Sequence, residues 1–188
     1  MKHRLFTSIE IPPEIVSRIV LLQKKIDAQG LPIRWQKSEK LHLTLNFLGR
    51  VEEDKINNVK NAISDVTAQF SRFTLKPSFL ETMYQKHDFS YIYLAPTGDL
   101  ETLSQIQKQL SVSFGEMDIP QPKKFLAHIT IGFVQKSDPV YTKSVLDTIN
   151  GLNFVPMSKF EVDSISLFES FLAKDTSHFQ KIGRFMLR

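Results

Sequence analysis

Two short segments of the chain share a pattern in which one aliphatic residue separates a histidine from a threonine. Residues 42–47 read His-Leu-Thr-Leu-Asn-Phe, and residues 128–133 read His-Ile-Thr-Ile-Gly-Phe. A single His-x-Thr is a weak motif, because most isolated histidines are structural or lie on the surface. A second copy with the same flanking residues is hard to obtain by chance in a chain with five histidines. We therefore treat the pair as candidate catalytic residues, and the nearly half-chain spacing as a sign of divergent duplication.

The alternation of residues along a strand predicts where these side chains point. His42 and Thr44 share one face of an extended segment, and the aliphatic residues between them occupy the other. The same alternation places His128 and Thr130 together in the second copy. The aliphatic faces require a covering of helices, whereas the two polar faces would meet across a cleft if a pseudo-two-fold axis relates the halves.

Two imidazoles and two hydroxyls in one cleft suit the cleavage of a phosphodiester without a metal. Imidazole titrates near neutrality, so a neutral histidine can take a proton from water while a charged one protonates the leaving oxygen. Thr44 and Thr130 can donate hydrogen bonds to the non-bridging phosphate oxygens. A 2',3'-cyclic phosphate fits this chemistry because its ring is strained. The residues alone do not separate the acid from the base, because the halves are nearly symmetric.

The remaining patterns predict the elements that position the motifs. Apolar residues at helical spacing predict a helix between Pro12 and Gly30 and further helices over about 52–69, 99–113 and 139–150. Alternating segments predict strands over about 3–9, 33–36, 41–47, 72–80, 90–95, 125–133, 160–168 and 178–187, with Gly49 closing the third. The interleaving indicates an α+β fold with antiparallel sheets. Residues 1–188 should form a single domain, because no Gly-, Ser- or Pro-rich linker divides them.

The composition excludes several classes of site and places few limits on partners. The net charge of +4 would help an anionic ligand to approach, but it is too small to indicate nucleic acid by itself. The chain has no cysteine, which excludes disulfides and thiolate metal sites. No histidine or carboxylate cluster has metal-ligand spacing, so we expect neither metal nor cofactor. No segment resembles a signal peptide or membrane span, so we expect a cytoplasmic monomer that does not bind membranes.

The motif pair resembles the two-histidine (2H) phosphoesterase superfamily, and specifically its bacterial RNA 2',3'-cyclic phosphodiesterases, once called 2'-5' RNA ligases. The similarity extends over most of the chain beyond the two motifs. It includes Arg4-Leu5-Phe6, Arg34-Trp35, Phe47-Leu48-Gly49 and Leu167-Phe168-Glu169-Ser170.

This resemblance implies a bilobal fold, in which two pseudo-symmetric antiparallel sheets with outer helices surround a central cleft. It also implies hydrolysis of a 2',3'-cyclic phosphate to a 2'-phosphate, on an RNA end or a small cyclic nucleotide, with weak 2'-5' ligation as the reverse reaction. In the family the first histidine is the proton donor and the second is the proton acceptor. The resemblance assigns these roles to His42 and His128, respectively.

One departure from the family pattern bears on the substrate. The family commonly has an arginine that contacts phosphate five residues after the second histidine, and here that residue is Phe133. Lys136, Arg34 and Arg4 are the candidates for a replacement cation. The alanine at position 127, where the family often has proline, should have no consequence.

Several further residues are candidates for substrate binding, and other functions stay open. Arg34, Trp35 and Lys136 lie near the motifs in sequence, and Phe6 is suited to stacking on a base, although residues such as Trp35 and Phe6 belong to the core more often than to a binding site. The loss of the arginine at Phe133 favours a non-catalytic nucleotide- or RNA-binding protein on the same fold. A phosphodiesterase acting on 2'-5' oligonucleotides or small cyclic nucleotides, and a simple interaction module, are the remaining alternatives.

Overall fold

A computed structural model describes residues 1–85, 89–122, 124–134, 138–172 and 177–188. The strands are β1 (Lys2–Glu10), β2 (Ile33–Trp35), β3 (His42–Glu52), β4 (Phe73–Met83), β5 (Ser90–Gly98), β6 (Ile129–Val134), β7 (Phe160–Val162), β8 (Ser164–Leu172) and β9 (Ser177–Met186). The α-helices are α1 (Pro13–Asp27), α2 (Ile56–Thr67), α3 (Leu100–Glu116) and α4 (Pro139–Asn150). Two short 3-10 helices, η1 (Ser38–Lys40) and η2 (Glu53–Lys55), flank β3.

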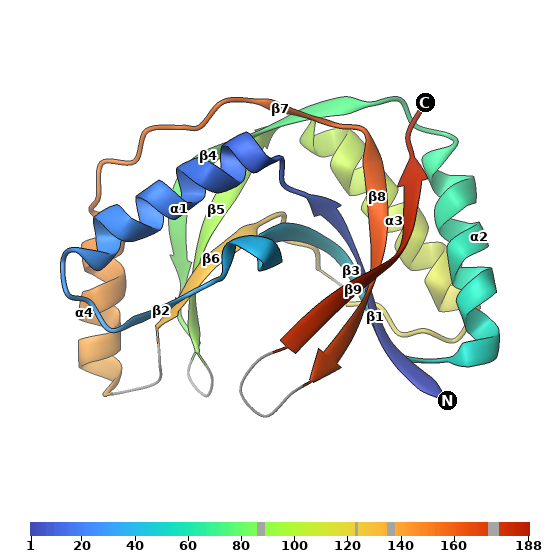
Figure 1. Cartoon of the computed structure of the whole chain (residues 1–188), viewed down its shortest axis with the longest axis horizontal. Coiled ribbons are helices and arrows are strands. Elements are labelled where there is room, and N and C mark those ends of the chain that lie inside the picture. Colours follow the sequence, from blue (N-terminus) through green and yellow to red (C-terminus); the bar gives the residue numbers. More distant parts are fainter. Residues whose placement is uncertain (86–88, 123, 135–137, 173–176) are drawn as a thin grey trace.

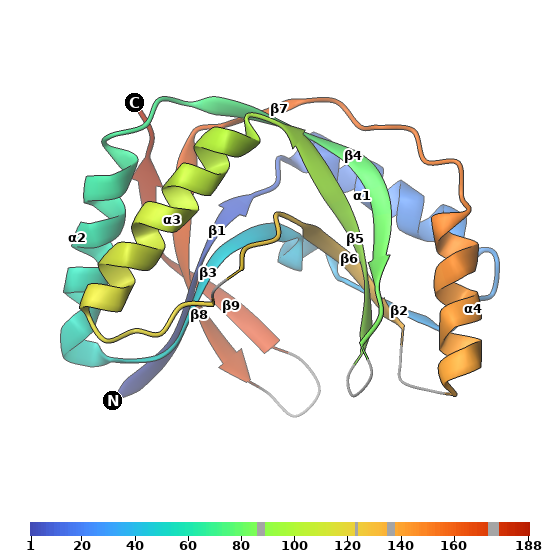
Figure 2. The ribbon, with the colours of Figure 1, turned by 180° about the vertical axis from the view of Figure 1, so that it is seen from behind.

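The described strands form one curled antiparallel sheet in which two lobes meet. Its order is β7-β4-β5-β6-β3-β1-β8-β9, and β2 also pairs with β6. The lobes join where β3 meets β6, through the pairing of Leu43 with Ile129. Helices α2 and α3 lie outside one lobe, and α1 and α4 lie outside the other (Figures 1 and 2). The predicted α+β bilobal arrangement is confirmed, with the two expected sheets joined edge to edge.

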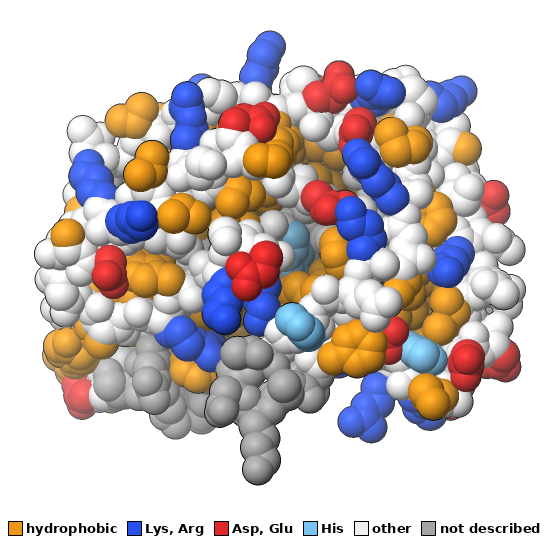
Figure 3. Space-filling model, in the orientation of Figure 1, with side chains coloured by type: hydrophobic (Ala, Val, Ile, Leu, Met, Phe, Trp, Pro, Cys, Tyr) orange, Lys and Arg blue, Asp and Glu red, His pale blue; other side chains and the backbone are white. Residues whose placement is uncertain are grey.

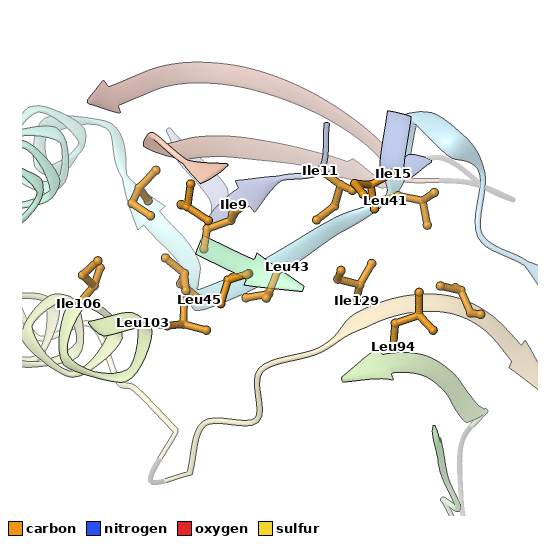
Figure 4. Packing of buried hydrophobic residues seen from close by; sticks show 14 of the residues in the cluster. Ile9, Ile11, Ile15, Leu41, Leu43, Leu45, Leu94, Leu103, Ile106 and Ile129 are labelled. Atoms are coloured by element: carbon orange, nitrogen blue, oxygen red, sulfur yellow. The ribbon is translucent and has the colours of Figure 1, made fainter. Parts of the chain in front are cut away.

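The aliphatic residues of both motifs form the core beneath the helices. Leu43, Ile129 and Ile131 are fully buried, and Leu45 is nearly so. Figure 4 shows Leu43 and Leu45 on β3 facing residues of α3, with Ile129 nearby on β6. The motif histidines and threonines alternate with these residues and are only half-buried. The two-residue period of each motif therefore separates a core face from a polar face, as predicted.

Strand boundaries near both motifs differ from those expected. Strand β3 does not end at Gly49 but continues to Glu52, and its register with β1 shifts between Leu5 and Phe6. Gly49 has a φ of 67°, which a glycine adopts without strain, so it sits at a β-bulge instead of closing the strand. Strand β6 begins at Ile129 and not at residue 125, so His128 lies just before its first paired residue. Within the described ranges, no helix is long and apolar enough to cross a membrane.

Candidate active site

A cavity of about 640 Å³ opens on the concave side of the sheet, where the two lobes meet. The histidine and the threonine of each motif line it: His42 and Thr44 from β3, His128 from just before β6, and Thr130 from β6. Figure 3 shows the molecule hollowed near the middle of this face, with histidine atoms inside the hollow. The fold thus brings together two motifs that lie nearly half a chain apart in sequence.

Both histidine rings are held by equivalent hydrogen bonds. The Nδ1 of His42 lies 2.8 Å from the carbonyl oxygen of Lys40, and the Nδ1 of His128 lies 2.7 Å from that of Leu126. A carbonyl oxygen only accepts hydrogen bonds, so Nδ1 carries the proton in both rings. This fixes Nε2 as the atom that gains or loses a proton. In each case the carbonyl belongs to the residue two positions earlier, so the local conformation is repeated in the two lobes.

The surroundings of the two imidazoles differ. The ring of His42 lies 5.1 Å from that of Phe6 and 5.6 Å from that of Phe179, whereas the ring of His128 lies 5.6 Å from that of Tyr93. Burial lowers the pKa of His42 below its ordinary value, because the charged form loses hydration. The hydrogen bond to the Lys40 carbonyl opposes this shift, and the charge of His128 adds to it. His42 is therefore neutral over a wider pH range than an exposed histidine.

The wall of the cavity is cationic and aromatic. Arg4, Lys40 and Lys124 line it, and no aspartate or glutamate occurs among its described lining residues. Seven phenylalanine and tyrosine residues complete much of the wall: Phe6, Phe47, Tyr91, Tyr93, Phe125, Phe133 and Phe179. Such a cavity favours an anionic ligand that also presents a flat apolar group. Within the described ranges, no three histidine, aspartate or glutamate side chains lie close enough together to hold a metal ion.

The residues predicted to bind substrate occupy different places. Phe6 lines the cavity and stacks on Phe168 at a centroid distance of 5.4 Å. Arg34 is not a lining residue, but its guanidinium lies over the ring of Phe133, which is one. Lys136 lies outside the described residues.

Trp35 lies outside the cavity, on the side of the sheet covered by α1. Its Nε1 donates a hydrogen bond to Asp27 Oδ1 at 2.8 Å, near the C-terminal end of α1. It pairs with Gly132 of β6, and a side chain at that position would collide with the indole ring. The tryptophan is thus packed as a structural residue and not as part of the cavity wall.

The sequence patterns did not single out several residues that line the cavity. Tyr91 and Tyr93 alternate with buried Ile92 and Leu94, which is the same period that marks the motif histidines and threonines. That alternation could have identified them as cavity residues. Lys40 and Lys124 carry no such signal, because lysines before a strand are common on any surface.

Comparison with known proteins identifies the same family. The family model described as "LigT like Phosphoesterase" matches residues 9–83 and 94–177. A protein of Methanocaldococcus jannaschii named RNA 2',3'-cyclic phosphodiesterase is 28% identical over 169 residues, which cover 90% of this chain and 92% of that protein. A protein of Thermotoga maritima with the same name is 24% identical over 169 residues, 90% of this chain and 87% of its own.

Solved structures agree at the level of the fold. The crystal structure of Escherichia coli LigT complexed with 3'-AMP superposes with a TM-score of 0.77 at 20% identity, covering 100% of this chain and 99% of that one. The protein TT0787 of Thermus thermophilus gives a TM-score of 0.76 at 19% identity and covers 98% of both chains. The match of the family model over most of the sequence shows that the chain belongs to the LigT-like phosphoesterase family.

Proposed function

We propose that this protein hydrolyses RNA 2',3'-cyclic phosphate ends to 2'-phosphates, using His42 and His128 as a metal-independent acid–base pair. The observation that carries the proposal is the pair of imidazoles in one cavity, each held with Nδ1 protonated and Nε2 available. The curated relatives named RNA 2',3'-cyclic phosphodiesterase support the choice of substrate. The absence of acidic side chains from the described lining is consistent with a phosphate ligand.

The proposed reaction is a single in-line displacement. His128 accepts a proton at Nε2 from a water molecule as the water oxygen attacks phosphorus. The bond from phosphorus to the ribose 3' oxygen breaks, and His42 donates its Nε2 proton to that oxygen, which leaves a 2'-phosphate and a free 3' hydroxyl. Thr44 and Thr130 donate hydrogen bonds to the non-bridging oxygens as these gain negative charge. Proton, water and leaving group balance without any further reactant.

If His42 is the acid, its imidazole must become protonated when the substrate binds. The resemblance to the family implies this role, yet burial lowers the pKa of His42 in the free protein. A phosphate anion beside the ring favours the charged imidazolium. Binding of the substrate would therefore charge His42 at the moment when a proton donor is needed.

Cations of the cavity wall replace the arginine that the family has at the position of Phe133. Arg4, Lys40 and Lys124 all line the cavity, so each is available to contact a bound phosphate or the adjoining chain. Lys136 remains a candidate for the same role. Loss of one of them should weaken binding more than turnover, because none is needed for proton transfer.

The decisive test supplies a short RNA with a 2',3'-cyclic phosphate end in excess EDTA and identifies the new terminus by mass and NMR. We expect a 2'-phosphate from the wild-type protein and almost none from His42→Ala or His128→Ala. A 3'-phosphate product, or activity only after metal is added, would contradict the proposal.

The same experiment separates the alternatives. Tight binding of the RNA without turnover would indicate the non-catalytic binding protein, for which the arginine-to-phenylalanine departure at Phe133 is the supporting observation. Faster cleavage of 2'-5' oligonucleotides or small cyclic nucleotides than of RNA ends would change the substrate while preserving the chemistry. Joining of RNA ends at high concentration would reveal the reverse reaction, 2'-5' ligation.

A further inference from the structure

Three neighbouring strands place a cation and two aromatic rings side by side at the cavity. Arg34 of β2 pairs with Phe133 of β6, and Phe133 pairs on its other side with Tyr91 of β5. Directly paired residues of neighbouring strands point to the same face of a sheet. Because Phe133 and Tyr91 line the cavity, this row of side chains borders it.

A register shift determines that Phe133 faces the cavity. Thr130 and Phe133 are three positions apart, which in a regular strand would place them on opposite faces. The pairing of β5 with β6 shifts between Ile92 and Tyr93, so that Thr130 opposes Tyr93 and Phe133 opposes Tyr91. Both β6 side chains therefore reach the cavity from the same side of the sheet.

Phe89 joins this row to form what we call the Arg34 cluster, composed of Arg34, Phe89, Tyr91 and Phe133. The guanidinium carbon of Arg34 lies 4.6 Å from the ring centroid of Phe89 and 4.9 Å from that of Phe133. The Phe133 ring meets Tyr91 at 5.6 Å and Phe89 at 6.3 Å, both edge to face. The planar cation of Arg34 thus lies over two rings. Phe133 and Tyr91 line the cavity, whereas Arg34 and Phe89 lie at its border, and Phe89 is 39% exposed.

The cluster is one step along the sheet from the hydroxyl proposed to bind phosphate. Tyr93 pairs with Thr130 and Tyr91 pairs with Phe133, so the two rows are two β5 residues apart, or about 6.5–7 Å. In a nucleotide, a single ribose separates the phosphate from the base. A phosphate held at Thr130 would thus leave a base of the same RNA end within reach of the cluster.

We propose that the Arg34 cluster is a nucleobase-stacking subsite that holds a base of the RNA end beside the cyclic phosphate. This inference rests on the proposed function for the identity of the ligand. Aromatic rings and arginine planes bind bases through their faces, which are common to all four bases. Phenylalanine in place of the family's arginine would therefore exchange a contact with phosphate for a contact with a base, and binding would depend on a base being present.

The test uses tri-ribonucleotides that end in a 2'-phosphate, the expected product, because they bind without being consumed. One carries 2-aminopurine as the terminal base and another carries it as the preceding base, since stacking quenches the fluorescence of this analogue. We expect the wild-type protein to quench one of the two. Phe89→Leu, Phe133→Leu and Arg34→Ala should each weaken binding roughly tenfold and reduce the quenching, as is typical when a stacking partner is removed. Phe133→Tyr, which keeps the ring, should retain both.

Matched controls come from exposed residues outside the cavity. Phe79 of β4 is 54% exposed, and Arg18 of α1 is also exposed, so Phe79→Leu and Arg18→Ala should bind and quench as the wild type does. Circular dichroism of each variant verifies that it is folded. Comparison of Phe133→Tyr with Phe133→Leu isolates the contribution of the aromatic ring at one position.

The position that is quenched tells which base is bound, and either result supports the subsite. Absence of quenching, or quenching that Phe133→Leu, Phe89→Leu and Arg34→Ala leave unchanged, would overturn it. Turnover of the cyclic phosphate is measured separately. If the protein turns over the cyclic phosphate but the variants leave quenching unchanged, the subsite is wrong and the proposed function stands. If the base is quenched but no turnover occurs, the proposed function is wrong and the subsite stands.

Discussion

The two motif segments have the same local geometry but different surroundings. Each places a histidine and a threonine on the cavity side, and each histidine donates from Nδ1 to the carbonyl two residues earlier. His42 is enclosed by Phe6 and Phe179, and its pKa is lowered chiefly by burial, whereas His128 has its ring contact with Tyr93. The repeated sequence therefore sets the orientation of the two imidazoles, and the non-repeated neighbours make them chemically different.

The fifth residue differs between the two motifs, and so do the residues that it contacts. Asn46 is fully buried, and its amide donates hydrogen bonds of 2.8 Å to Ser111 and to Gln121, which tie β3 to α3 and to the segment that follows α3. Its counterpart Gly132 lacks a side chain and leaves space for Trp35. The histidines and threonines that face the cavity are thus identical in the two motifs, whereas the fifth position, which faces the packing within each lobe, differs.

The largest expected effect tests whether both lobes contribute to catalysis. His42→Ala and His128→Ala should each reduce kcat/KM for the cyclic phosphate by about 100- to 10,000-fold, because each removes one proton-transfer group. Steady-state kinetics with a short RNA substrate measure this. His178→Ala is the matched control, since His178 is exposed on β9, and it should retain wild-type activity. A small effect of either active-site substitution would show that only one lobe is catalytic.

Substitution of either threonine should lower activity less than substitution of a histidine, and by a similar factor in each lobe. Thr44→Ala and Thr130→Ala each remove one donor to the non-bridging oxygens, and each should lower kcat about 10- to 1,000-fold. Thr44→Ser and Thr130→Ser keep the hydroxyl and should recover most of the activity. If serine is no better than alanine, the hydroxyls do not stabilise the transition state.

The pH dependence of kcat/KM separates the roles of the two histidines. The wild type should give a bell-shaped profile, because the base must be neutral and the acid charged. His42→Gln should lose the fall at high pH, and His128→Gln should lose the fall at low pH, in the residual activity of each variant. Exchange of these two results would reverse the assigned roles. A flat wild-type profile between about pH 5 and pH 8 would contradict paired acid–base catalysis.

Binding of an anion should oppose the effect of burial on the pKa of His42. We expect inorganic phosphate to raise the pKa of His42, because the negative charge counteracts the cost of burying the imidazolium. NMR titration of the imidazole protons with and without phosphate measures the change. The same titration of Arg4→Ala tests whether a cation of the cavity wall strengthens phosphate binding, in which case the pKa of His42 should rise less than in the wild type. An unchanged or lower pKa in phosphate would show that the anion does not sit beside His42.

The smallest effect concerns stability. The folded pKa of His42 lies below the ordinary histidine value of 6.5, so the unfolded chain binds more protons as the pH falls through that value. The free energy of unfolding should therefore decrease as the pH is lowered below about 6.5. Glu10 and Asp163 also have lowered pKa values, but their contributions are lost only as the pH falls below the ordinary values of these groups, 4.5 and 3.8. Urea unfolding should show a weaker decrease in His42→Gln, and parallel curves would contradict this assignment.

The sequence by itself determined that each motif strand has an apolar and a polar face. It also indicated that His42, Thr44, His128 and Thr130 belong to one site. It could do so because the two-residue period of a strand is local, and because a repeated motif and a family resemblance both point to one cavity. The helices were also predictable from local periodicity, although their ends moved by a few residues.

The tertiary structure alone decided several other features of the cavity and its surroundings. The bulge at Gly49, the packing of Trp35 against Gly132 and the turn of Phe133 toward the cavity all depend on the register of a partner strand. The lowered pKa of His42 depends on burial beneath rings from β1 and β9. These features arise from contacts between segments far apart in the chain, and no local period encodes them.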